Sequence, residues 1–313
     1  MAPAVQRIYG FWGEPTSTLD WCEENYVVTD LVAEFWNTIS NWMMIVPPAL
    51  GLLLTWQTRN ELRFMIAFLS LFMVGIGSLC FHATLLFEMQ LLDELPMIYC
   101  SCVFLFCIIE CASTSGKNHK ALVVFFIFIS LLISVVYMTI KNPLLFQWAY
   151  GILVACVTLQ ALVKCRKYHC SKKLLAVSVI SYGTGFILWN IENNFCPSVR
   201  YLRNNAFTPF QLFTQLHAVW HLLAGIGSYY HILFSLDLRM RCKRKTPKLM
   251  LVWGWLPYIC ATEKTVNNNS ECKSVPVSLY QMVYSYSRSW TLSARLHFII
   301  IGYGGRQLYR LRI

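Results

Sequence analysis

The sequence predicts an all-α fold, a bundle of seven transmembrane helices, and three observations support this prediction. Hydrophobic residues make up 57% of the 313 residues and charged residues only 13%, whereas a soluble domain carries roughly 25% charged residues. The apolar residues gather into seven runs, each close to the ~20 residues that a helix needs to cross a bilayer. The net charge of +11 comes from basic residues in short loops between these runs, which is typical of a membrane protein and does not indicate nucleic-acid binding.

The apolar runs divide the chain into three predicted parts. Residues 1–30 form a polar, acidic segment, residues 31–238 form the membrane domain, and residues 239–313 form a basic block followed by a tail. The pair Pro47 and Pro48 predicts a kink in the first span, where neighbouring helices would satisfy the freed backbone groups. The predicted spans cover residues 31–56, 64–86, 94–111, 121–140, 144–163, 174–191 and 209–236.

The distribution of lysine and arginine predicts the orientation in the membrane. Loops that contain Arg59, Arg63 and residues 117–120, 164–173 and 239–248 lie on one side. Cytosolic loops carry the excess of lysine and arginine, so we expect this side to be cytosolic, with a lumenal N-terminus and a cytosolic C-terminus. The basic residues of the opposite side are Arg7, Lys141, Arg200 and Arg203.

This orientation brings five polar residues to a similar depth near the lumenal side. Glu34 begins the first span, His82 lies near the end of the second, Asp93 begins the third, and His217 and His221 lie in the seventh. An ionisable side chain inside a membrane is costly unless it is paired or bound to a metal, so it marks a candidate functional site. We therefore expect these residues to form one site.

The histidines of this group predict a metal centre. His217 and His221 are four residues apart, so one helix face carries both rings, a common way for a helix to supply two metal ligands. His82 at matching depth would be the third ligand, and three histidines with an open fourth position are a catalytic zinc arrangement. The alternative is three buried histidines, each with its own hydrogen bond.

Two further residues are candidates for acid–base and oxyanion roles. Asp93 would serve as the general base and return the proton to the leaving group. The alternative is that Asp93 or Glu94 is a helix N-terminal carboxylate favoured by the helix dipole. Ser78 lies one turn before His82 and would donate to a developing oxyanion. From spacing alone, a hydroxyl bonded back to its own helix is the more common interpretation.

The N-terminal segment contains candidate calcium ligands and a candidate disulfide cysteine. Calcium binds 6–8 oxygen ligands, and the segment is rich in side-chain oxygens without having the EF-hand pattern. A solvated acidic segment is the alternative. Cys22 and Cys196 lie in the two main lumenal segments and would pair in an oxidising lumen; the alternative is two free thiols. The oxygen donors are Asp20, Glu23, Asn25 and Glu34, with the carbonyl of Trp21.

Several ordered motifs resemble those of the alkaline ceramidases, most closely the phytoceramidase branch. The resemblance runs from residue 1 to about residue 257, after which the chain departs from the family pattern. The region 258–313 includes a glycosylation sequon at Asn268 that would stay unmodified on the cytosolic side. The motifs are Asp20-Trp21-Cys22-Glu23-Glu24-Asn25-Tyr26, Glu34-Phe35-Trp36-Asn37, Gly77-Ser78-x-Cys80-Phe81-His82, Gln90 to Met97, Phe186-x-x-Trp189-Asn190 and His217-x-x-Trp220-His221.

The resemblance implies a multi-pass amidohydrolase of the endoplasmic reticulum and Golgi membranes. Its expected substrates are ceramides within the membrane, with unsaturated long-chain ceramide, phytoceramide and dihydroceramide as candidates, and the sequence predicts no particular partner protein. It implies Zn2+ as a catalytic cofactor and Ca2+ as a structural or regulatory one. The implied residues are His82, His217 and His221 for zinc, Ser78 and Asp93 for catalysis, Asp20, Trp21, Glu23, Asn25 and Glu34 for calcium, Cys22 and Cys196 for a disulfide, and Tyr150 and Trp220 for the substrate pocket.

Two other classes of protein share some of these features. A seven-span receptor of the progestin/adiponectin type also carries three zinc-binding histidines, but the block from Gln90 to Pro96 and the acidic N-terminal cluster favour the ceramidase. A transporter that moves protons through intramembrane ionisable groups is the third class. No repeat or pair of discontinuous helices in the sequence supports a transporter.

Overall fold

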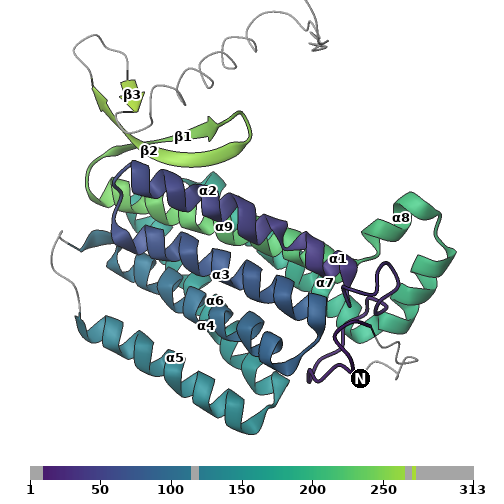
Figure 1. Cartoon of the computed structure of the whole chain (residues 1–313). Helices are drawn as coiled ribbons and strands as arrows, with labels where there is room; N and C mark the ends of the chain where they lie inside the picture. Colours follow the sequence, from purple (N-terminus) through teal and green to yellow (C-terminus); the bar gives the residue numbers. More distant parts are fainter. Residues whose placement is uncertain (1–9, 114–119, 265–269, 273–313) are drawn as a thin grey trace, which may run out of the picture.

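The computed structural model describes residues 10–113, 120–264 and 270–272, and its long helices form a bundle with a small β-sheet at one end (Figure 1). The all-α prediction is correct for the bundle, whereas the sheet was not predicted. The helices are α1 (Phe35–Ser40), α2 (Trp42–Gln57), α3 (Leu62–Thr84), α4 (Phe87–Ile109), the 3-10 helix η1 (Glu110–Ala112), α5 (Lys120–Ile140), α6 (Pro143–Tyr168), α7 (Lys172–Asn205), α8 (Thr208–Phe213) and α9 (Leu216–Cys242).

Six helical segments in the described part of the chain are long and apolar enough to cross a membrane. They comprise α1 with α2, then α3, α4 with η1, α5, α6 and α7. Helix α9 has 27 residues, but its histidines and its charged C-terminal end make it less apolar. The fold is thus that of a multi-pass helical membrane protein, and the seventh span stays a prediction.

The outer surface of the bundle has the apolar character that lipid contact requires. Helix α5 shows this most clearly, because Val124 is 64% exposed, Phe128 60% and Leu131 58%. Contiguous exposed apolar surface on this scale indicates a membrane or an interface rather than water. Helix α9 contrasts with α5, since it packs against α2, α3, α4, α6 and α7 and all its residues from His231 to Met240 are buried.

The structure corrects the start of the third predicted span. That span was expected to begin at Glu94, but α4 begins at Phe87. Asp93 and Glu94 therefore lie inside the helix, and Glu88 is the acidic residue of its first turn. The interpretation of Asp93 or Glu94 as a helix N-terminal carboxylate is wrong, because the dipole effect falls off within the first turn.

Three other details of the predicted spans also change. The expected polar loop after residue 191 is helical, because α7 continues to Asn205 with a kink at Phe195, two residues before Pro197. In the first span, the break between α1 and α2 lies at Asn41, and both prolines lie inside α2. The seventh predicted span begins later than expected, at Leu216, after the short helix α8.

The chain after α9 folds back onto the bundle as a three-stranded sheet of order β1-β2-β3. Strands β1 (Thr246–Val252) and β2 (Leu256–Lys264) are antiparallel, with β3 (Ser270–Cys272) beside β2. The Tyr258 hydroxyl lies 3.1 Å from the side chains of Thr55, Thr58 and Asn60 at the end of α2. The predicted basic block and tail are therefore partly ordered structure. Asn268 of the predicted sequon lies outside the described residues.

Candidate metal and catalytic site

Three buried histidines meet at one end of the bundle. His82 lies near the C-terminal end of α3, and His217 and His221 lie in the first turns of α9. One ring nitrogen from each histidine lies within 4.8 Å of the others, and all three residues are at most 3% exposed. The structure therefore brings together the histidines that the sequence analysis grouped.

Polar groups around the cluster engage the Nδ1 atoms of two rings. His82 Nδ1 lies 2.5 Å from Glu34 Oε2. His221 Nδ1 lies 2.9 Å from Ser40 Oγ and 3.0 Å from the carbonyl oxygen of Asn37. Such outer contacts fix the orientation of metal-binding histidines.

The residues present fit a zinc ion. The buried Nε2 of His82 has no hydrogen-bond partner in the described part of the chain. Buried polar atoms without a partner are uncommon, and each calls for an explanation such as an ion. Among the described residues His231 Nε2 is also unpaired, but His231 does not belong to the group of ring nitrogens that could share one ion. A zinc ion held by three neutral imidazoles would account for the unpaired nitrogen of His82.

Ser78 and Asp93 face each other across the contact between α3 and α4. Ser78 is buried one turn before His82, and its side chain interacts with the Asp93 carboxyl group. The preceding residues explain this approach. A Cβ added at Gly77 would overlap the backbone of Leu92, so only glycine lets the two helices come this close.

The structure gives Asp93 and its neighbour Glu94 different surroundings, which the spacing in the sequence did not show. Glu94 accepts hydrogen bonds from Gln90 Nε2, at 3.1 Å, and from the Tyr137 hydroxyl. These bonds hold Glu94 in a structural network with the N-terminal segment, because Gln90 Oε1 also accepts from the backbone N–H of Thr18 at 2.8 Å. Asp93, which lies beside Ser78, therefore stays the candidate of this pair for the site.

The acidic N-terminal residues lie next to the histidine cluster. Asn25 Nδ2 is 3.4 Å from Asp20 Oδ1, and Trp21 N is 3.3 Å from Glu34 Oε1. Glu23 accepts from the first backbone N–H groups of α1, at 2.7 and 2.8 Å. Burial, followed by the nearby Glu34 carboxylate, raises the pKa of Glu23 to about 8. A cation bound among these carboxylates would relieve this repulsion.

The predicted cysteine pair is a disulfide in the structure. Cys22 is joined to Cys196, with their Cα atoms 5.5 Å apart, and this bond ties the N-terminal segment to α7. Arg203 strengthens the connection, since Nη1 donates to the Cys22 carbonyl at 3.1 Å and to Glu24 Oε2 at 2.6 Å.

Two residues near the site were missed by the sequence analysis. Glu192 is 2% exposed, and its Oε2 lies 3.8 Å from His217 Nδ1. It was overlooked because residues after 191 were expected to form a polar loop. Tyr182 connects the two predicted pocket residues, because its hydroxyl is hydrogen-bonded to that of Tyr150 and its ring lies 5.0 Å from that of Trp220. Nothing in the spacing of Tyr182 distinguished it from a core residue.

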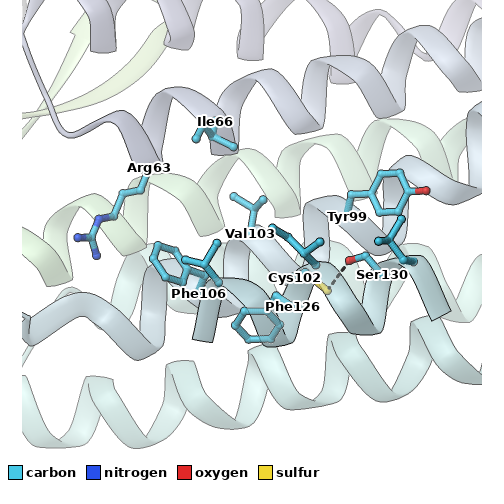
Figure 2. Close-up of a pocket in the computed structure, with 11 residues that line it drawn as sticks. Arg63, Ile66, Tyr99, Cys102, Val103, Phe106, Phe126 and Ser130 are labelled. Carbon is cyan, nitrogen blue, oxygen red and sulfur yellow. Dashed lines mark hydrogen bonds between the residues drawn. The ribbon is translucent and has the colours of Figure 1, made fainter. Parts of the chain in front are cut away.

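An apolar cavity of about 360 Å³ lies apart from the histidine cluster, between α3, α4 and α5 (Figure 2). Tyr99, Cys102, Val103 and Phe106 line its α4 side, and Ser130 donates to the Cys102 sulfur at 3.5 Å. The lining includes no carboxylate or histidine, so the cavity does not supply acid–base groups.

A charged cluster closes the opposite end of the bundle. Glu61 Oε1 lies 2.8 Å from Arg239 Nε and 2.5 Å from Lys243 Nζ, and Glu61 Oε2 lies 2.9 Å from Arg63 Nε. Although burial opposes ionisation, the hydrogen bonds from Arg239 and Lys243 hold the pKa of Glu61 below its ordinary value. The two ends of the bundle thus differ in chemistry, with histidines at one and ion pairs at the other.

The fold and this site define a multi-pass helical membrane protein with a buried three-histidine centre. The model of the Ceramidase family matches residues 13–260. The chain is 47% identical to alkaline ceramidase 3 of Mus musculus over 261 residues, which cover 83% of this chain and 97% of the mouse protein. It is 32% identical to alkaline ceramidase YPC1 of Saccharomyces cerevisiae, over 79% of this chain and 84% of the yeast protein. The chain belongs to the ceramidase family, and the receptor interpretation is not favoured.

Proposed function

We propose that this protein is a zinc-dependent amidohydrolase that cleaves the amide bond of ceramides within the membrane, releasing a sphingoid base and a free fatty acid. The observation that carries the proposal is the buried cluster of His82, His217 and His221 beside the Ser78–Asp93 pair. The printed names of the mouse and yeast relatives describe alkaline ceramidases, which supports ceramide as the substrate class.

The chemistry divides among a metal ion and two side chains. Zinc held by the three histidines would act as a Lewis acid on the ceramide carbonyl and lower the pKa of water. Asp93 takes a proton from the attacking water and delivers it to the amide nitrogen as the carbon–nitrogen bond breaks. Once Asp93 has taken this proton, its carboxylic acid group can donate to the Ser78 oxygen, which frees the Ser78 proton for a hydrogen bond to the charge that develops on the carbonyl oxygen. The water oxygen ends in the fatty acid, and the proton ends on the amine.

The placement in the membrane suits a two-chain lipid. We propose α9 as the seventh span, since its 27 residues extend about 40 Å at 1.5 Å per residue. The histidines then lie near the lumenal surface, where they reach the amide while the acyl chains stay in apolar surroundings. A location in the endoplasmic reticulum and Golgi membranes is part of this proposal, with unsaturated long-chain ceramide, phytoceramide and dihydroceramide as candidate substrates.

The function is tested by supplying an unsaturated long-chain ceramide to the purified full chain at alkaline pH. Equimolar release of fatty acid and sphingoid base is expected. A protein that binds the ceramide but releases neither product, although properly folded, would contradict the proposal.

Replacing Gly77 by alanine is expected to lower ceramide hydrolysis at least tenfold. The added methyl group would push α4 away at Leu92, the residue next to Asp93, and so would separate Asp93 from Ser78. Overpacking of this kind costs about 1–3 kcal/mol of stability, so the thermal midpoint should fall as well. The matched control is Gly151→Ala, where nothing lies within 4 Å of an added Cβ. Equal activity of the two variants would show that this helix contact is not needed.

Calcium is proposed to stabilise the N-terminal segment through Asp20, the Trp21 carbonyl, Glu23, Asn25 and Glu34. Removing calcium at a fixed free zinc concentration is expected to lower the thermal midpoint by roughly 2–4 °C, the shift that corresponds to about 1 kcal/mol in a protein of this size. The Glu34→Gln variant should show a low midpoint that calcium no longer changes. If the wild-type midpoint is the same with and without calcium, the structural role is excluded.

A further inference from the structure

The hairpin formed by β1 and β2 has one face in the core of the bundle and one apolar face outside. Val252, Leu256 and Tyr258 are at most 1% exposed and belong to the main hydrophobic core of the helices. On the outside, the exposed residues include Leu249 (50%), Leu251 (51%), Trp253 (37%) and Trp255 (50%). The core contacts hold the hairpin in place, so its outer residues are presented in a fixed position.

The hairpin runs back along α9 from the charged end of the bundle. Arg239 of α9 pairs with Glu61 at that end, while the Tyr229 hydroxyl donates to the Pro257 carbonyl of β2 at 2.8 Å. Tyr229 precedes Arg239 by ten residues, which is about 15 Å along a helix. The turn of the hairpin therefore points toward the middle of the bundle, and Figure 1 shows the sheet lying over α2 and α9.

The turn places two tryptophans at its tip, and the first of them has a positive φ. Trp253 has φ 52° and Gly254 has φ 78°, and Trp255 N donates to the Val252 carbonyl at 3.3 Å. Glycine adopts positive φ readily, but for a bulky side chain this is an outlier. Positive φ at both central positions is the geometry of a tight hairpin turn, so the turn holds both tryptophans at the tip of the hairpin.

We propose that the outer face of the β1–β2 hairpin binds the lipid leaflet at the Glu61 end of the bundle, with the tryptophans among the acyl chains near the headgroups. Tryptophan is enriched at membrane–water interfaces because its ring is apolar with one polar group. The exposed cations Arg244, Lys245 and Lys248 lie at the base of the hairpin. They complement the phosphates of anionic lipids, which lie closer to water than the acyl chains.

The backbone sets a limit on the depth of the hairpin. Strand β1 is an edge strand, since it pairs only with β2 in the described sheet, and one side of its backbone needs hydrogen bonds to water. An open edge is not tolerated in the hydrocarbon core. The tryptophans therefore lie in the interfacial region and not at the bilayer centre, so the proposal predicts a depth as well as a partner.

The proposal is tested with the full chain in nanodiscs whose lipids carry bromine, a contact quencher, either high or low on the acyl chain. Subtracting the emission of the Trp253→Ser/Trp255→Ser variant from that of the wild type isolates two of the 11 tryptophans. Their emission is expected to be quenched more strongly by bromine near the headgroup than by bromine deep in the chain. A Trp253→Phe/Trp255→Phe variant controls for folding of the hairpin.

A second measurement tests the charged base of the hairpin. Adding phosphatidylserine to phosphatidylcholine nanodiscs at low salt is expected to raise the thermal midpoint of the wild type, and less so that of Arg244→Gln/Lys248→Gln. Quenching of the two tryptophans by aqueous acrylamide and not by brominated lipid would overturn the proposal. Quenching by brominated lipid that disappears when the protein dimerises would also overturn the proposal, because the outer face of the hairpin would then bind a second copy of the chain.

Discussion

Replacing Asp93 by asparagine is expected to reduce the kcat of ceramide hydrolysis about 10³-fold, within the range that general acid–base catalysis contributes. Asparagine keeps the size of the side chain and can still bond to Ser78, so the contact between α3 and α4 should persist. What the variant loses is the ability to take the proton of the attacking water. KM should change little, because the lost interaction belongs to the transition state.

Glu94→Gln is the matched control for this variant. Glu94 is the next residue on the same helix and is buried, but it bonds to Tyr137 and Gln90. We expect it to retain activity within about tenfold of the wild type and to lose thermal stability instead, by the ~1–3 kcal/mol that a disturbed buried hydrogen bond costs. A loss of kcat in Glu94→Gln with little change in Asp93→Asn would reverse the two assignments.

Replacing His82 by glutamine is expected to abolish measurable hydrolysis and to weaken zinc binding. Of the three clustered histidines, His82 lies on α3 and the other two lie on α9, so the variant would leave two ligands, both from α9. Its effect should exceed that of Asp93→Asn, because both the metal and the orientation of the substrate carbonyl are lost. Competition with a chromogenic zinc chelator measures the affinity separately from the reaction.

His231 offers a control on the same helix as two of the ligands. It is buried and stacks on Phe104 with ring centroids 5.1 Å apart, away from the histidine cluster. His231→Gln should bind zinc with wild-type affinity and keep its activity. If His82→Gln retained wild-type zinc affinity, or His231→Gln lost it, the assignment of the metal centre would be wrong.

The histidine cluster could be predicted because its signals are independent of exact helix boundaries. His217 and His221 share a helix face by spacing alone, and the positive-inside pattern placed His82 at the same depth. The spacing gave little basis for preferring Asp93 to Glu94, since the surroundings of the two side chains depend on where α4 begins. Because α4 begins at Phe87 and not at Glu94, both acids lie inside the helix. There Asp93 lies beside Ser78, whereas Glu94 is hydrogen-bonded to Tyr137.

Other features depend on tertiary contacts that leave little trace in a single sequence. Glu192 was assigned to a polar loop because the residues after 191 lose their apolar character, but the disulfide at Cys196 and the contacts of Arg203 keep this part of α7 helical. The hairpin was overlooked because its residues were assigned to a cytosolic basic block and a tail, with no secondary structure predicted for them. Its stability comes from Tyr258 and the residues at the end of α2, about 200 positions earlier in the chain.

Metal removal and restoration would test the central claim most directly. The purified full chain is analysed for metal content, stripped of zinc with a chelator, and assayed for fatty acid release from ceramide before and after zinc is returned. One zinc per chain is expected, with loss of hydrolysis on stripping and recovery with zinc but not with magnesium. Undiminished hydrolysis by a chain shown to contain no zinc would contradict it.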